Sequence, residues 1–430
     1  MTGPLPTFAW ADLLTACPAL DSVLCGEVEA SAVILASSLA QPGTWRRVPG
    51  LAYRAPAPRA NPLNKAQLDL DHLPFPAWDD GIPSRLGFGF VTVGSSRGCY
   101  HACTFCLPCA LHRAHATSPH RTRSVNNMVE EIEALYQRGA RLFLFDDEQF
   151  LAPGSLRVNQ INEWRDQLRQ REMDIAFTIK CRPDDVEEML FRELREMGLI
   201  RVYLGIESGC QATLNLLGKG TTVGRNAEAL AVLDALDIVA DFRTLLFQPW
   251  STLETIRQDL GFLRSVLPHV PTAFAFHEVE CYPGTPLAER LTAEGRGDGN
   301  PWPLSYTIGC PQAELLRRLG RVVFGARNAD GICNQLTEAW FDVLLLRRFL
   351  PDRSVETRAR ALRDAAARLN AETVAVWQEM LSVVERGNVH DTESVNEHVA
   401  AWAAGINAFD MTLEEELAQP KECCLGNMVI

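Results

Sequence analysis

The stretch RGCYHACTFC, residues 97–106, carries the strongest structural signal in this sequence. It places Cys99, Cys103 and Cys106 at C-x₃-C-x₂-C spacing. Three thiolates on so short a loop can bind one soft metal centre, whereas a closed iron–sulfur cubane or a structural zinc site takes four protein ligands. The spacing therefore predicts a metal centre that keeps one coordination position open.

This stretch resembles the cluster loop of the radical S-adenosylmethionine (SAM) enzymes. In that family three cysteines hold a [4Fe-4S] cluster, and the amino and carboxylate groups of SAM bind its fourth iron. One electron then cleaves SAM to methionine and a 5′-deoxyadenosyl radical. Phe105 matches the apolar position beside the adenine. The alternative is a zinc knuckle whose fourth ligand is Cys109, His112 or His115.

A predicted strand precedes this loop, and helix and strand patterns alternate after it. This alternation is typical of parallel strands, and the resemblance implies an α/β fold with a partial (β/α)₆ barrel. The predicted strands cover 87–93, 141–145, 175–180, 201–206, 239–247 and 273–279. The predicted helices between them cover 124–139, 154–171, 184–197, 224–236 and 252–266.

Three domains are predicted. Residues 83–300 form the barrel, and residues 301–430 form a helical C-terminal domain, with helices near 312–324, 335–350, 352–385 and 392–407. Residues 1–82 form a short α/β N-terminal region that resembles a truncated cobalamin-binding domain.

The resemblance to cobalamin-binding domains rests on two short motifs. Gly26-Glu27-Val28-Glu29 and Leu73-Pro74-Phe75-Pro76 match pieces that close that domain in one radical SAM subfamily. The cobalt-ligating motif Asp-x-His-x-x-Gly does not occur, and about 80 residues are too few for a doubly wound fold. We therefore expect no cobalamin.

Polar side chains at the predicted strand ends are the candidates for binding SAM. The resemblance places Asp146, Asp147 and Glu148 near the SAM amino group, where a helix N-cap cluster is the alternative. It places Glu207, in Gly205-Ile206-Glu207-Ser208-Gly209, at the ribose hydroxyls. The remaining cofactor-binding candidates are Ser208, Lys180 and Arg182, the last two opposite the SAM carboxylate or simply solvated.

The predicted catalytic side chains are Glu278, Glu280 and Asp147. Strand alternation sends Glu278 and Glu280 to one face and His277 to the other. Inward carboxylates suit an amino-bearing substrate, and a nearby acid can protonate a leaving hydroxyl. A salt bridge to the barrel helices is the alternative. Near this strand, Pro283-Gly284-Thr285-Pro286-Leu287 also matches the family.

Composition limits the possible partners and location. The chain has 430 residues, a net charge of −13 and 47% hydrophobic residues. This negative charge is unsuited to a general nucleic-acid binder. No apolar run is long enough to span a bilayer, and the N-terminus lacks the features of a signal peptide. We therefore expect a cytoplasmic protein without nucleic-acid or membrane partners.

The chain holds 13 cysteines, which in a cytoplasmic protein indicates metal ligands or buried thiols. Cys310, Cys333, Cys423 and Cys424 are candidates for an auxiliary iron–sulfur cluster.

The narrower resemblance is to radical SAM enzymes of actinomycete natural-product pathways, among them an aminoglycoside diol dehydratase. It implies radical dehydration of an amino sugar such as paromamine. It also implies a flavodoxin-type electron donor and an NADPH-dependent reductase that acts on the product. The alternatives are a cobalamin-dependent radical SAM methyltransferase and a zinc-binding scaffold without turnover.

Overall fold

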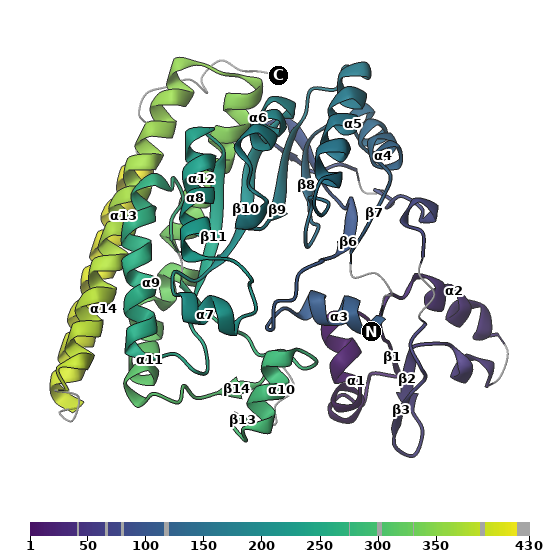
Figure 1. The fold of residues 1–430 in the computed structure, drawn as a ribbon, viewed down its shortest axis with the longest axis horizontal. Helices are drawn as coiled ribbons and strands as arrows, with labels where there is room; N and C mark the ends of the chain where they lie inside the picture. Colours follow the sequence, from purple (N-terminus) through teal and green to yellow (C-terminus); the bar gives the residue numbers. More distant parts are fainter. Residues whose placement is uncertain are drawn as a thin grey trace.

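The central feature of the fold is a seven-stranded sheet with helices on both of its sides (Figure 1). It is seen in a computed structural model that describes residues 1–40, 43–64, 68–78, 81–115, 120–274, 276–298, 303–329, 331–387 and 392–418. The strand order is β12-β11-β10-β9-β8-β5-β4. Six of these strands are parallel neighbours, which confirms the predicted α/β fold with six strand units.

The parallel strands lie close to their predicted positions. They are β5 (Phe88–Val93), β8 (Ala140–Phe145), β9 (Ala176–Cys181), β10 (Leu199–Glu207), β11 (Val239–Phe247) and β12 (Phe276–Glu278). The short strand β4 (Ser84–Arg85) adds an antiparallel edge that the sequence patterns did not predict. Because β4 and β12 are the two ends of the strand order, the described sheet is an open, partial barrel.

Helices on the convex side connect the parallel strands. Three of them, beginning at Val125, Val223 and Leu253, are capped by a hydroxyl: Ser124, Thr222 and Thr252 accept bonds from the backbone N three residues later. Their apolar faces bury Ile132, Trp164 and other side chains in one core with the outer faces of the strands. These helices are α4 (Val125–Gln137), α5 (Leu156–Gln170), α6 (Glu188–Met197), α7 (Gln211–Leu216), α8 (Val223–Ala235) and α9 (Leu253–Val266).

Four long helices follow the barrel, as the sequence predicts: α11 (Pro311–Ala329), α12 (Ile332–Phe349), α13 (Arg353–Glu385) and α14 (Thr392–Ala418). Helices α9, α11, α13 and α14 pack together along one side of the molecule (Figure 1). Leu336 and Trp340 of α12 share a buried cluster with Leu142 and Ile200 of the sheet. The C-terminal helices therefore close one end of the barrel rather than forming a core of their own.

The N-terminal region is a small α/β unit. It contains α1 (Pro4–Ala16), β1 (Ser22–Leu24), α2 (Glu29–Ser38), β2 (Leu51–Arg54) and β3 (Pro58–Ala60), and these strands pair antiparallel in the order β1-β2-β3. It packs onto the barrel through Phe8, whose ring leaves no space for a Cβ at Gly284, where φ is +84°. The predicted Pro-Gly-Thr-Pro-Leu segment is therefore the part of the barrel domain against which Phe8 of α1 packs.

The structure also contains several short elements. They are β6 (Ser96–Gly98), α3 (Leu107–His115), β7 (His120–Thr122), α10 (Pro286–Ala293), β13 (Gly297–Asp298), β14 (Ser305–Tyr306) and the 3₁₀ turns Thr44–Arg47, Leu70–His72, Pro183–Asp185 and Leu267–His269.

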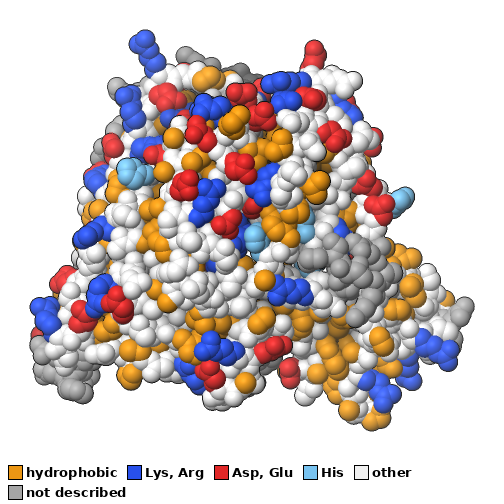
Figure 2. Space-filling model, viewed as in Figure 1, with side chains coloured by type: hydrophobic (Ala, Val, Ile, Leu, Met, Phe, Trp, Pro, Cys, Tyr) orange, Lys and Arg blue, Asp and Glu red, His pale blue; other side chains and the backbone are white. Residues whose placement is uncertain are grey.

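The outer surface carries both signs of charge. On the face drawn in Figure 2, acidic and basic side chains are interspersed, and no large patch of one sign is present. Such a face lacks the basic stripe that contacts a phosphate backbone. None of the described helices combines the length and the apolar character that a bilayer crossing needs.

Candidate active site

The cysteine loop follows strand β5 and lies at the carboxyl ends of the parallel strands. Strands β6 and β7 form an antiparallel ribbon that brackets it. Thr104 at its centre donates from its backbone N to Leu217 O at 2.9 Å and accepts at its O from Leu287 N at 2.9 Å. Gly218, at φ +63°, lies so close that a Cβ would come 3.0 Å from Ala102 O. Distant segments therefore fix the loop's path.

The three predicted ligands have different neighbours. Cys103 is buried, and Arg182 Nη1 lies 3.4 Å from its sulfur. Cys99 and Cys106 both have the Cys109 thiol as a neighbour. This neighbour and, against burial, the charges of Arg182 and Lys219 lower the pKa of Cys99 to about 7.

The donor chemistry of the loop fits a cluster held by three thiolates. Within the described residues, no three His, Cys, Asp or Glu side chains already stand in the arrangement that holds a metal ion. The three thiols nevertheless come from one loop, two cations lie beside it, and Cys106 opens onto a cavity. Loop cysteines that hold a [4Fe-4S] cluster supply this type of ligand.

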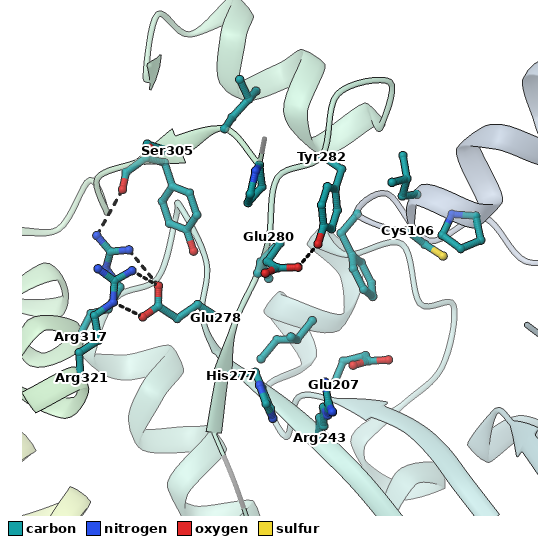
Figure 3. A pocket seen from close by; sticks show the side chains of 18 of the residues that line it. Cys106, Glu207, Arg243, His277, Glu278, Glu280, Tyr282, Ser305, Arg317 and Arg321 are labelled. Atoms are coloured by element: carbon teal, nitrogen blue, oxygen red, sulfur yellow. Dashed lines mark hydrogen bonds and ion pairs between the residues drawn. The ribbon is translucent and has the colours of Figure 1, made fainter. Parts of the chain in front are cut away.

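The cavity beside Cys106 has a volume of about 790 Å³ (Figure 3). The loop contributes Phe105 and Cys106 to its wall. Strands β10 to β12 and the segment after β12 supply the polar side chains. Those side chains are Tyr203, Glu207, Arg243, His277, Glu278, Glu280, Tyr282, Ser305, Tyr306, Arg317 and Arg321. Five predicted residues thus meet here: Phe105, Cys106, Glu207, Glu278 and Glu280.

The three carboxylates of this wall have different partners. Glu278 lies 3.0 Å from Arg317 and also pairs with Arg321, both on α11 (Figure 3). Glu207 lies 3.3 Å from Lys219. Glu280 accepts a hydrogen bond from the Tyr282 hydroxyl and forms no ion pair with a described residue. Glu280 is therefore the carboxylate on this wall that is free to bind a cation.

The prediction that Glu278 binds a substrate ammonium group is not supported by its surroundings. Its carboxylate instead forms ion pairs with two arginines of the C-terminal helix α11, so it is a salt bridge as in the alternative, but not one to a barrel helix.

The prediction that His277 faces away from Glu278 and Glu280 was wrong. All three line the same cavity, because β12 ends at Glu278 and its pairing with β11 shifts register between Leu245 and Phe247. Strand alternation therefore does not continue to Glu280. Burial and the charge of Arg243 lower the pKa of His277 to about 4, so its imidazole is neutral at pH 7.

Asp147 is not placed for a catalytic role. It is 1% exposed and accepts hydrogen bonds from Ser95 N, Ser95 Oγ and Ser96 Oγ. Burial raises its pKa to about 6, against these bonds, which lower it. Its carboxylate is used to fix the segment that leads into the cysteine loop.

The Ser208 side chain does not line the cavity either. It is fully buried and donates from its hydroxyl to Asp259 at 2.6 Å. The neighbouring Glu207 points into the cavity because its backbone adopts φ +63° at the end of β10.

Lys180 and Asp146 form an ion pair with each other. They line a second cavity of about 720 Å³, which lies inside the barrel and shares Tyr203 with the first. Neither residue lines the cavity that holds Cys106 and Glu207.

Two further predicted residues lie beside the cysteine loop. Glu148 accepts a hydrogen bond from Gly98 N at 3.1 Å and lies 3.4 Å from His112 Nε2. Arg182 contacts Cys103 and also bonds Asp184 at 2.8 Å. Their predicted contacts to SAM, like that of Phe105 to the adenine, stay predictions.

Several cavity residues were not predicted from the sequence, including Tyr203, Arg243, Tyr282 and Arg317. One signal could have found the first two. Parallel strands buried on both faces are nearly continuous apolar runs, whereas polar residues alternate along 201–207 and 239–243. That alternation marks an inner face that lines a polar lumen.

The auxiliary-cluster candidates are not assembled in the described part of the chain. Cys333 is buried and its thiol lies 3.7 Å from Phe274 O, while Cys310 is partly exposed. Cys423 and Cys424 lie outside the described residues.

Residues 93–260 match the Radical SAM superfamily. The match covers the cysteine loop and the strands from β8 to β11, so it supports the predicted radical SAM domain over residues 93–260.

Named relatives support the class and differ in chemistry. An uncharacterized methyltransferase of Pyrococcus horikoshii is 27% identical over 68% of this chain and 62% of its own length. The anaerobic magnesium-protoporphyrin IX monomethyl ester cyclase of Rubrivivax gelatinosus is 26% identical over 61% of this chain. This chain covers 48% of that cyclase, so it spans only part of the length of these relatives.

Solved structures share the fold. The cobalamin-dependent radical SAM enzyme OxsB, with aqua-cobalamin bound, superposes with a TM-score of 0.64 at 16% identity, covering 97% of this chain and 71% of OxsB. The radical SAM methyltransferase TsrM of Kitasatospora setae gives 0.55 at 15% identity, covering 70% of this chain and 61% of TsrM. These neighbours do not support the expectation that cobalamin is absent, and at this identity they show the fold alone.

Proposed function

We propose that this chain is an enzyme that cleaves SAM reductively at a [4Fe-4S] cluster held by Cys99, Cys103 and Cys106. We further propose that it dehydrates a diol of an amino sugar, and that paromamine, the substrate of the diol dehydratase of apramycin biosynthesis, is a substrate of this type. A flavodoxin-type donor would supply electrons, and an NADPH-dependent reductase would act on the product.

The observation that carries the amino-sugar proposal is the state of Glu280. It is exposed, it has no ion-pair partner among the described residues, and it lines a cavity that also contains Cys106. A carboxylate in this position gains a charge-assisted hydrogen bond from a substrate ammonium group. The hydroxyls of Tyr282 and Ser305 and the neutral imidazole of His277 add the hydrogen-bonding groups that a polyhydroxylated ligand needs.

When bound, the cluster and SAM supply a 5′-deoxyadenosyl radical that takes one hydrogen atom from a carbinol carbon. The substrate radical then loses its neighbouring hydroxyl as water, gives up its own hydroxyl proton, and takes one electron and one proton to become a deoxy ketone. The overall reaction therefore consumes two electrons, one for SAM cleavage and one for the last step.

The chain's own residues would move these protons. The neutral imidazole of His277 can accept the hydroxyl proton, since its lowered pKa leaves it unprotonated at pH 7. The Tyr282 oxygen, whose proton is donated to Glu280, can accept a hydrogen bond from a substrate hydroxyl. The negative charge of Glu278 is offset by its ion pairs with Arg317 and Arg321, so this part of the wall does not attract a further cation.

A cobalamin-dependent methyl transfer is the second candidate, and the fold similarity to OxsB and TsrM favours it. In this case purified protein would bind cobalamin tightly.

Formation of 5′-deoxyadenosine tests the proposal. Anaerobically reconstituted protein would be incubated with SAM and dithionite, with and without paromamine, and without cobalamin. We expect paromamine to stimulate 5′-deoxyadenosine formation at least about tenfold, and Cys103→Ala to abolish it, because a cluster with two thiolate ligands is not held.

Other outcomes separate the two parts of the proposal. SAM cleavage that ignores paromamine would overturn the amino-sugar substrate and leave the radical SAM activity. A colourless protein with one zinc and no iron after anaerobic purification would overturn both and favour the scaffold.

A further inference from the structure

One carboxylate of the N-terminal region contacts both ends of the cysteine loop. Glu27 lies in the turn between β1 and α2, and its side chain is only 7% exposed. We call Glu27, Glu29, Arg97, His112, Arg121 and Glu148 the Glu27 cluster. Nothing in the SAM-cleaving chemistry requires these groups to meet, so their arrangement calls for a separate explanation.

The first contacts reach the strand that enters the loop. Arg121 of β7 pairs with Glu27 through its Nη2, and Arg97 of β6 lies 3.5 Å from Glu27 through its Nη1. Arg97 also pairs with Glu29. Since Arg97 stands two residues before Cys99, and β6 and β7 pair at Arg97 and Arg121, Glu27 fixes the ribbon from which the loop begins.

The second contacts reach the helix that leaves the loop. His112 of α3 lies six residues after Cys106, and its Nδ1 is 3.5 Å from Glu27 Oε1. Its Nε2 is 3.4 Å from Glu148 Oε1, and the other oxygen of Glu148 accepts from Gly98 N at 3.1 Å. The chain of contacts therefore returns to the residue just before Cys99.

The charges of the Glu27 cluster balance when His112 is protonated: three carboxylates face two guanidinium groups and one imidazolium. The side chains of Glu27, Arg121 and His112 are 7%, 9% and 6% exposed. Removing one member of a buried ion pair leaves its partner uncompensated, so each group constrains the others.

We propose that Glu27 is a positioning residue that holds the two ends of the cysteine loop at the separation needed for SAM to bind. This inference rests on the proposed function only in that the loop holds the cluster to which SAM binds. It assigns the N-terminal region a role in the SAM site that does not involve cobalamin. Glu29 and Glu148 support the same arrangement.

The test compares SAM binding by cluster-loaded Glu27→Gln and wild-type protein, without any amino sugar. The matched control is Arg54→Met, because Arg54 bonds Leu14 O and Cys17 O within the N-terminal region and does not contact the Glu27 cluster. The measurements are iron and sulfide per chain, the dissociation constant of SAM by equilibrium dialysis, and the change in the electron paramagnetic resonance spectrum of the reduced cluster on SAM addition.

We expect Glu27→Gln to keep its iron and sulfide, to raise the SAM dissociation constant about tenfold, and to weaken the spectral change. Arg54→Met would match the wild type in all three. Arg97→Gln, at a half-buried position, is the second variant if Glu27→Gln does not fold, and we expect SAM binding and the spectral change to weaken in the same way.

Unchanged SAM binding and spectra in Glu27→Gln and Arg97→Gln would overturn the proposal. An equal loss in Arg54→Met would also overturn it, because the effect would then reflect general loosening of the N-terminal region. A wild-type protein that binds no SAM would instead overturn the proposed function, which makes the two failures distinguishable.

Discussion

Two neighbouring residues at the end of β10, Glu207 and Ser208, point in different directions and have different partners. Glu207 adopts φ +63°, a conformation that is uncommon for residues other than glycine, and this turns its carboxylate into the cavity. Ser208 turns the other way and bonds Asp259, which also accepts from Gly209 N at 2.6 Å. The buried Asp259 therefore anchors the turn that presents Glu207, and such strain is typical of functional sites.

The anchoring carboxylate makes stability depend on pH. Burial raises the pKa of Asp259 to about 7, against the bonds from Ser208 and Gly209, which lower it. The unfolded chain has the ordinary value near 3.9, so the folded state binds more protons between these values. The contribution of Asp259 to stability is therefore fully present below about pH 4 and is lost as the pH rises through about 7.

Replacing Asp259 by Asn removes this titration and keeps an acceptor for Ser208. Between pH 5 and 7 we expect the free energy of unfolding of Asp259→Asn to fall less steeply than that of the wild type, by up to about 1.4 kcal/mol per pH unit. Thermal unfolding at several pH values measures the difference. Glu163→Gln, at an exposed carboxylate of α5, is the control, and parallel pH profiles for Asp259→Asn and wild type would contradict the account.

At the scale of elements, a glycine sets the approach of α11 to α13. A Cβ at Gly320 would lie 2.0 Å from the ring of Trp377, which is fully buried between Phe247, Phe276 and Phe324. The ring therefore has no free space into which it can move. Since α11 also carries Arg317 and Arg321, this contact sets the position of one wall of the cavity.

Gly320→Ala is expected to destabilise the protein by about 1–3 kcal/mol through overpacking. The matched control is Gly325→Ala on the same helix, where nothing lies within 4 Å of the added Cβ. That control should gain up to about 1 kcal/mol from helix propensity. Thermal unfolding measures both, and equal midpoints for the two variants would show that α11 does not depend on this contact.

The elements themselves were largely predictable. The six parallel strands and the four C-terminal helices lie close to their predicted ranges, because long periodic segments reflect burial on one face. Strands β4, β6 and β7 were not predicted, since two or three residues are too few to show a period. Their positions depend on pairing with distant segments.

Parts of the site were less predictable. The cysteine loop, Phe105 and Glu207 follow from local motifs, and Phe105, Cys106 and Glu207 line one cavity in the structure. The Cys103 thiol instead contacts Arg182, and Cys99 does not line this cavity. Asp147 and Ser208 were assigned from their position at strand ends. Position at a strand end does not determine whether a side chain turns to the cavity or to a buried partner.

At the scale of the whole molecule, both the N-terminal region and the C-terminal helices contribute charged side chains to the site on the barrel. The C-terminal helices carry Arg317 and Arg321 to the cavity, and the N-terminal region carries Glu27 to the cysteine loop. Both contacts join residues far apart in sequence, so neither could be read from local patterns. The second contact links the N-terminal region, whose strands pair antiparallel, to the cysteine loop.

The central claim is that the radical made at this site removes water from an amino-sugar diol. The most direct test is the mass of the product formed from paromamine by cluster-loaded protein with a reductant and SAM labelled in its methyl group. The account predicts a product lighter than paromamine by one water and free of label. A product heavier by the labelled methyl group would contradict it and establish methyl transfer instead.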